Sequence, residues 1–214
     1  MIGHGRYALR FVSLLALLSL PQAAPLAASL KGEFTMSGKA PEVGLIYFTE
    51  DKSASLKDPN TINQKNKEFT EKLVVGSKGS RVIFKNSDII NHNIFADDGE
   101  ANVKFDVGLL PPGSLADHNI GWEDKVIKCS CKIHPHMRAW IASVTSRYYK
   151  IVTFQPDEKT VKFEMEGFPE NLSKVKVWLP NYPTKEINIK KGESKRVEIE
   201  KADKSLGTLQ LTRE

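Results

Sequence analysis

Short apolar runs separated by turn residues make up most of the chain. Segments rich in Val, Ile, Phe and Tyr are bounded by Gly, Pro, Asn or Asp, and no sustained helical period accompanies them. The polar stretch 52–69 lacks this pattern, so we expect a loop or a short helix there. Elsewhere the pattern predicts an all-β protein whose first part is a Greek-key β-sandwich. The strands expected in this part cover residues 31–37, 44–49, 71–75, 80–85, 92–95, 104–108, 114–120, 124–131 and 139–144.

A second group of strands is expected after the first. In Val175, Val177 and Leu179 apolar side chains alternate with polar or larger ones, which is typical of a half-buried antiparallel sheet. We therefore predict a first sandwich over residues 29–153 and a small second antiparallel sandwich over 154–214, the latter without histidine or cysteine. The strands expected in this group cover residues 150–155, 160–166, 174–179, 184–189, 196–200 and 206–212.

The beginning of the chain has the layout of a secretory signal peptide. Arg6 and Arg10 precede an apolar block over residues 11–20, and Pro21 and an alanine-rich tail follow. The block is shorter than the roughly 20 residues that a membrane-spanning helix needs. We expect residues 1–28 to be removed, the mature chain to have no membrane span, and the protein to be exported to the periplasm.

The charge pattern argues against one class of partner. The chain carries 31 Lys and Arg against 26 Asp and Glu, a formal net charge of +5, but the basic residues are interspersed with acidic ones. Binding of nucleic acid would ask for a basic stripe or patch. We therefore expect no nucleic-acid partner.

Candidate metal ligands are concentrated in residues 129–137. This segment holds both cysteines, two of the five histidines and one of the four methionines. Thiolate, imidazole and thioether form a soft ligand set that suits copper, and two histidines with one cysteine and a weak axial methionine make a blue-copper site. Cys131, His134 and Met137 supply three of these groups. His92, at the end of a strand-like run, supplies the second imidazole.

Other metals and a disulfide fit this segment less well. Structural zinc sites use four Cys or His ligands without methionine, and iron–sulfur clusters need more than two cysteines. A disulfide between Cys129 and Cys131 would be strained, since one residue separates them. On a strand both sulfurs face inward, so Cys129 is expected to be a buried apolar filler while Cys131, at the strand end, reaches the metal. His136 offers a further imidazole, but its place beside Pro135 favours exposure.

At these residues the chain resembles the cupredoxins, and more narrowly the exported plastocyanin-like, amicyanin-like and methylamine-utilisation-type proteins. The resemblance implies a mononuclear type 1 copper site, with His92, Cys131 and His134 as strong ligands and Met137 as the weak axial one. It also implies that the His134 ring edge, flanked by Pro135, is the port for electrons. The likeness is carried by residues 62–69, 82–88, 92–95 and 131–139, the last with the Cys-x-x-His-x-x-Met spacing of amicyanin-like members.

Two further features bear on this resemblance. The residues after 154 resemble, through 163–169 and 175–178, the transthyretin-like or carboxypeptidase-regulatory-like modules that accompany such domains. Cupredoxins usually have a core aromatic residue two positions before the ligand cysteine, whereas this chain has Cys129. The second thiol keeps open a site in which Cu(I) is bound by thiolates.

We expect a one-electron carrier that serves redox partner proteins and is not an enzyme, because no general acid or base and no open metal position is evident. An alternative is a copper-handling protein, a chaperone or store, that binds Cu(I) through Cys129, Cys131 and Met137. A third possibility is an interaction protein on the same scaffold that binds no metal.

Overall fold

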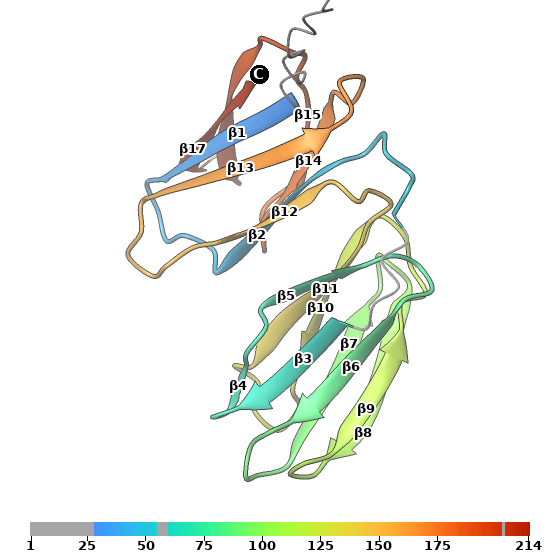
Figure 1. Cartoon of the computed structure of the whole chain (residues 1–214). Helices are drawn as coiled ribbons and strands as arrows, with labels where there is room; N and C mark the ends of the chain where they lie inside the picture. The colour runs from blue at the N-terminus through green and yellow to red at the C-terminus, as the bar shows by residue number, and fades with distance from the viewer. Residues whose placement is uncertain (1–27, 55–59, 203) are drawn as a thin grey trace, which may run out of the picture.

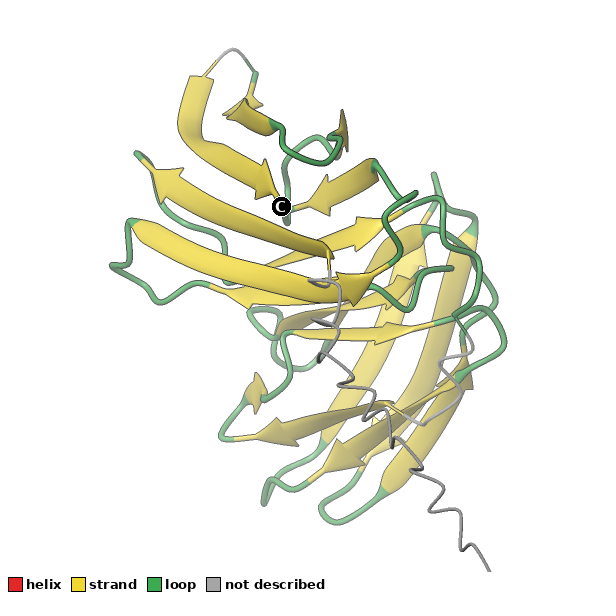
Figure 2. Ribbon diagram, turned by 45° about the horizontal axis from the view of Figure 1, so that its top comes forward, coloured by secondary structure: helices red, strands yellow, loops and turns green. Residues whose placement is uncertain are grey.

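The computed structural model describes residues 28–54, 60–202 and 204–214. The regular structure in this part of the chain consists of strands, from β1 to β17, without a helix (Figure 2). Consequently, none of these residues forms a helix that could cross a membrane. The strands build two β-sandwiches (Figure 1), so the predicted all-β class is confirmed. The predicted signal peptide lies outside the described residues except for Ala28.

The first sandwich encloses one apolar core. Alternation along β6 buries Val82 and Phe84, and Ile94 and Ile127 meet them from the opposite sheet. One sheet has the order β4 (Glu68–Phe69), β3 (Asn60–Lys65), β6 (Arg81–Asn86), β9 (Leu115–Asn119). The other has the order β5 (Leu73–Gly76), β11 (Arg138–Ser143), β10 (Lys125–Ser130), β7 (His92–Asp98), β8 (Val103–Leu110).

The second sandwich has its own core, in which Phe34, Phe163 and Leu209 are buried. Its strands pair antiparallel throughout, as the alternating pattern predicted. One sheet has the order β13 (Thr160–Phe168), β1 (Ala28–Met36), β17 (Lys204–Arg213), β16 (Ser194–Lys201). The other has the order β12 (Tyr149–Thr153), β2 (Val43–Phe48), β14 (Lys174–Trp178), β15 (Lys185–Asn188).

The first sandwich is inserted into the second along the chain. Strand β1 pairs with β13 and β17, and β2 pairs with β12 and β14. The prediction that residues 29–153 form the first sandwich and 154–214 the second is therefore wrong for β1, β2 and β12. Alternation of apolar residues tells which face of a strand is buried, but not which strand pairs with it.

The stretch 52–69 also differs from its prediction, because residues 60–65 and 68–69 form β3 and β4. Strand β3 has a polar sequence, yet Ile62 and Gln64 are fully buried, and its main chain pairs in parallel with β6. Strand β3 thus joins the sheet through two inward side chains and its ladder with β6. Residues 55–59 are outside the described part.

The two sandwiches meet through strand β2, which is buried on both faces. All six residues of β2 are buried: Ile46 and Phe48 face the core of the second sandwich, whereas Leu45 and Tyr47 face the first. The contact forms an interface cluster of Val43, Leu45, Tyr47, Leu73, Val75, Trp140, Ala142 and Val144. The turn between β6 and β7 lies at the opposite end of the first sandwich (Figure 1).

Candidate metal centre

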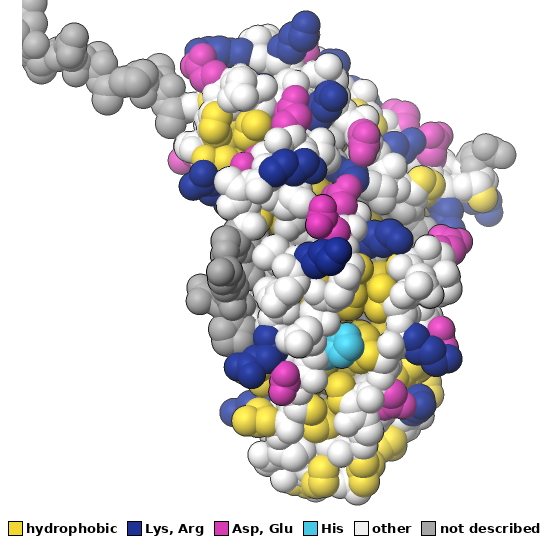
Figure 3. Space-filling view, turned by 90° about the vertical axis from the view of Figure 1, so that its right-hand side faces the viewer, with side chains coloured by type: hydrophobic (Ala, Val, Ile, Leu, Met, Phe, Trp, Pro, Cys, Tyr) yellow, Lys and Arg dark blue, Asp and Glu magenta, His cyan; other side chains and the backbone are white. Residues whose placement is uncertain are grey.

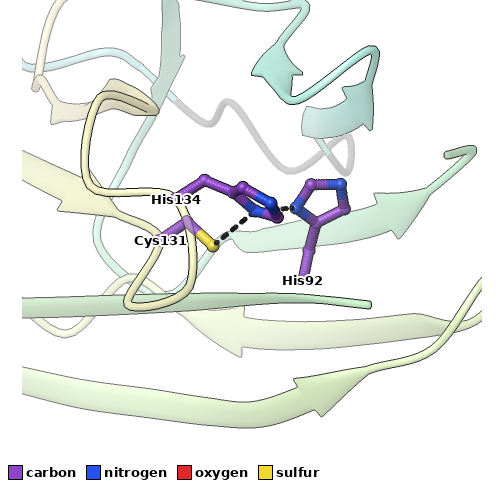
Figure 4. Close-up of side chains that lie close together, drawn as sticks. All are labelled: His92, Cys131 and His134. Atoms are coloured by element: carbon purple, nitrogen blue, oxygen red, sulfur yellow. Dashed lines mark hydrogen bonds between the residues drawn. The ribbon is translucent and has the colours of Figure 1, made fainter. Parts of the chain in front are cut away.

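Three of the predicted ligands converge at this far end. His92 begins β7, Cys131 follows β10, and His134 lies in the loop between β10 and β11. Their donor atoms all lie within 4.8 Å of one another. The two histidine Nδ1 atoms are 3.1 Å apart, and Cys131 Sγ is 3.9 Å from His134 Nδ1 (Figure 4). Residues distant in sequence thus present two nitrogens and one sulfur to a common point.

The side chain of Asn86 shapes the turn that delivers His92. It is fully buried, and its amide group donates to the carbonyl oxygens of Ile90 and Leu110 at 2.8 Å each. Its side-chain oxygen accepts from the main-chain N–H of Asp88 at 2.9 Å. Both N–H groups and the oxygen of this amide are hydrogen-bonded, so the buried Asn86 side chain holds the turn in place.

Asp88 orients the His92 ring. Its carboxylate accepts hydrogen bonds from the main-chain N–H of Lys67 at 2.8 Å and from His92 Nε2 at 3.0 Å. The bond from Lys67, then that from His92, and a further main-chain bond from Ile89 lower the pKa of Asp88 to about 2. The carboxylate is ionised at neutral pH and only accepts, so His92 donates from Nε2. The other ring nitrogen of His92, Nδ1, faces His134, and metal-binding histidines are oriented in the same way by a partner on the second ring nitrogen.

The loop 131–137 is closed on itself by main-chain bonds. Cys131 N–H donates to the Met137 carbonyl at 3.4 Å, and Met137 N–H donates to the His134 carbonyl at 2.9 Å. Lys132 N–H donates to the side-chain oxygen of buried Asn93 at 3.3 Å, which attaches the loop to β7. Burial, and then the electrostatic effect of His92, Lys67 and His136, lower the pKa of His134. The neutral imidazole, which can bind a metal, is therefore favoured.

Met137, the predicted axial ligand, is 2% exposed and packs in the core of the first sandwich. Its main chain bonds to both Cys131 and His134, so its backbone borders the three converging donors. Ligation through its sulfur stays a prediction.

Cys129 and His136 lie apart from the three converging donors. The thiol of Cys129 is fully buried and donates to the Ala139 carbonyl at 3.5 Å. Burial raises its pKa to about 12, and neither cysteine is in a disulfide. His136 is exposed and donates from Nε2 to the Lys67 carbonyl at 2.9 Å. Their surroundings are those of a core filler and a surface residue.

The converging donors fit a copper ion by type and by spacing. Two imidazoles and a thiolate are the strong ligands of blue-copper sites. Metals bind imidazole nitrogen at about 2.0 Å and thiolate at about 2.3 Å, so donors that share an ion lie roughly 3 to 4 Å apart. The separations of 3.1 and 3.9 Å agree with this spacing. His92 is fully buried and Cys131 is 1% exposed, which shields the site from water.

No protein-family model and no curated protein matches the chain. Among solved structures, a purple cupredoxin from Nitrosopumilus maritimus is 21% identical, with a TM-score of 0.35, over 40% of this chain and 98% of its own. Amicyanin from Paracoccus versutus is 18% identical, with a TM-score of 0.37, over 52% and 96%. The copper-containing nitrite reductase of Thermus scotoductus is 22% identical, with a TM-score of 0.37, over 41% of this chain and 22% of its own. These likenesses are remote, and the assignment of the site depends on its own geometry.

Sequence reasoning missed the residues that support the ligands. Asn86 and Asp88 lie in the stretch 82–88, which carried the resemblance but was given no role at the site, and Lys67 lies in the stretch expected to be a loop or a short helix. The available signal for Asp88 was its position, because it is a carboxylate four residues before a histidine that starts a strand. The contact with Lys67 had no such local signal, because it comes from a different hairpin.

Proposed function

We propose that the protein is an exported copper protein that carries single electrons between partner proteins. The observation that supports this function is the convergence of His92, Cys131 and His134 at one end of a β-sandwich, where His92 and Cys131 are buried. Met137 would be the weak axial ligand. Bound copper would supply the one-electron couple, and the chain would supply its coordination and its surroundings.

The residues around the site favour fast electron transfer. Asp88 holds the His92 ring, and the main-chain bonds of the loop hold Cys131 and His134. Ligands that are fixed in advance change little when the charge of a bound ion changes. The energy of reorganisation is then small, which an electron carrier requires.

An apolar rim around His134 supports docking of a redox partner at this end. His134 is partly exposed, and the strand pairs His92 with Leu110 and Leu115 with Lys85 place the neighbouring loops at the same end. Figure 3 shows apolar side chains gathered at the end of the first sandwich opposite the second. The large apolar residues exposed there are Ile89 at 90%, Leu109 at 61%, Leu115 at 64% and Ile133 at 46%. Exposed apolar patches mark sites of protein contact, so we propose His134 as the route for electrons.

The copper-handling alternative requires Cys129 to bind the ion. Its buried thiol donates to Ala139 and its pKa is raised, and both features disfavour the thiolate that Cu(I) would need. The electron-carrier function therefore has the better support. We propose no enzymatic activity and a periplasmic location.

Optical and EPR spectra of the full mature chain loaded with Cu(II) test the proposal. We expect intense visible absorption from charge transfer between Cys131 and copper, together with reversible one-electron reduction. A copper-loaded protein without that absorption would overturn a type 1 site. A protein that retains no copper after reconstitution would favour the metal-free interaction protein.

A further inference from the structure

The main chain of Lys67 contacts both segments that carry the histidines of the site. Its N–H donates to Asp88 at 2.8 Å, and the same carboxylate holds His92 Nε2 at 3.0 Å. Its carbonyl accepts from His136 Nε2 at 2.9 Å, and His136 belongs to the loop that carries Cys131 and His134. One residue thus joins the turn before β7 to the loop after β10.

The backbone conformation of Lys67 makes these two bonds possible. Asn66 and Lys67 have φ values of 55° and 59°, and they connect Lys65 of β3 to Glu68 of β4, which are paired. Two left-handed central residues are the mark of a type I′ hairpin turn, in which glycine is usual at the second position. A lysine here is an uncommon choice that costs free energy. Such strained positions occur where the surrounding contacts compensate for them.

His136 is better placed to hold the loop than to bind a metal. Its Nε2 is engaged by the carbonyl of Lys67, and its side chain is exposed. Its ring meets that of His134 at an edge, with centroids 6.2 Å apart. The bond to Lys67 reaches across 69 positions of the sequence, so it fixes the loop against a separate hairpin.

We propose that the main chain of Lys67 ties the two histidine segments together, and that His136 is a positioning residue that keeps the loop 131–137 closed over the site. The tie is made by groups of the chain itself. The effect of the tie on copper binding depends on the function proposed above. The lysine side chain has no part in it.

Three variants of the full mature chain distinguish the main-chain tie through Lys67 from other roles of His136 and of the Lys67 side chain. His136→Ala removes the donor, whereas His136→Gln retains an amide N–H that can reach the Lys67 carbonyl. Lys67→Gly removes the lysine side chain but keeps the main-chain groups and tolerates the positive φ. His136 is exposed, so its replacement leaves the core intact.

Amide hydrogen exchange of Met137 in the metal-free protein is the first measurement, because this N–H donates to His134 inside the loop. We expect His136→Ala to speed exchange roughly three- to tenfold, which corresponds to loss of one hydrogen bond. His136→Gln and Lys67→Gly should exchange within about twofold of the wild type, within the scatter of such contributions. In the copper-loaded protein, His136→Ala should release copper to a chelator faster by a similar factor and keep the position of its visible band.

The proposal is overturned if His136→Ala leaves Met137 exchange unchanged, or if His136→Gln loses as much protection as His136→Ala. It is also overturned if His136→Ala shifts the copper band without changing the metal-free protein, because His136 would then be a ligand. Should the exchange pattern hold in a protein that binds no copper, the tie stands and the proposed function fails.

Discussion

The hydroxyl group of Tyr47 donates a hydrogen bond of 2.6 Å to the carboxylate of Asp124. Tyr47 belongs to β2 of the second sandwich, and Asp124 immediately precedes β10 of the first, so this bond joins the two units. Lys176 of β14 pairs with the other carboxylate oxygen at 2.5 Å. Burial, and then the bond to Asp124, raise the pKa of Tyr47, which keeps the phenol protonated and able to donate.

Tyr47→Phe should destabilise the protein by about 1 kcal/mol, because the ring remains while one hydrogen bond between the sandwiches is lost. Urea denaturation measures the change. Tyr149→Phe is the matched control: Tyr149 faces Tyr47 across the strand pair, and its hydroxyl makes no side-chain hydrogen bond in the described structure. Equal losses in the two variants would contradict a specific role for the bond to Asp124.

The two cysteines should respond differently to replacement by serine. Cys131→Ser should abolish the visible band of the copper form, since it removes the sulfur of the converging donors. Cys129→Ser should keep the band and the reduction potential, because the Cys129 thiol is not among the converging donors and donates to the Ala139 carbonyl. Optical titration with Cu(II) and voltammetry check both expectations. Loss of copper affinity in Cys129→Ser would support the copper-handling alternative.

Met137→Leu should retain the visible band and raise the reduction potential. The strong ligands are unchanged, whereas loss of a weak thioether donor destabilises Cu(II) relative to Cu(I). The change of volume is small, so the stability of the metal-free protein should fall by less than about 1.5 kcal/mol. Voltammetry and thermal denaturation separate the two effects. An unchanged potential would mean that Met137 only packs in the core.

Glu50 should make the protein sensitive to acid. Burial by itself would raise the pKa of Glu50, but hydrogen bonds from Lys174 N–H at 2.8 Å, from the Ser173 hydroxyl at 3.0 Å and from Ser173 N–H lower it below the ordinary value of 4.5. A carboxyl group with a lowered pKa in the folded state contributes stability above its unfolded pKa and loses it as the pH falls through the folded value.

The denaturation midpoint should therefore fall more steeply below about pH 4.5 in the wild type than in Glu50→Gln, since this value is the ordinary pKa from which folding displaces Glu50. At neutral pH Glu50→Gln should be the less stable of the two, because an amide replaces an ionised acceptor. Urea denaturation over a series of pH values checks this. Parallel pH profiles would contradict the role of Glu50.

Local sequence determined most of the strands and the chemical identity of the candidate ligands. Alternation of the apolar residues Val175 and Val177 predicted β14, and the crowding of soft donors in residues 129–137 identified Cys131, His134 and Met137 as candidates. These features depend on neighbouring positions in the chain. Polar β3 was missed, because its place in the sheet depends on the adjacent β6 more than on its own composition.

Only the tertiary structure decided which distant segments meet. It paired β1 and β2 with strands that follow the inserted sandwich, and it brought the main chain of Lys67 between Asp88 and His136. The period of a strand specifies which side chains turn inward, but several strands can satisfy the same period. The choice of which strands pair depends on two requirements. Both faces of β2 must be buried, and buried polar groups such as Asn86 must be hydrogen-bonded. Local sequence cannot meet these requirements, because the partners come from distant parts of the chain.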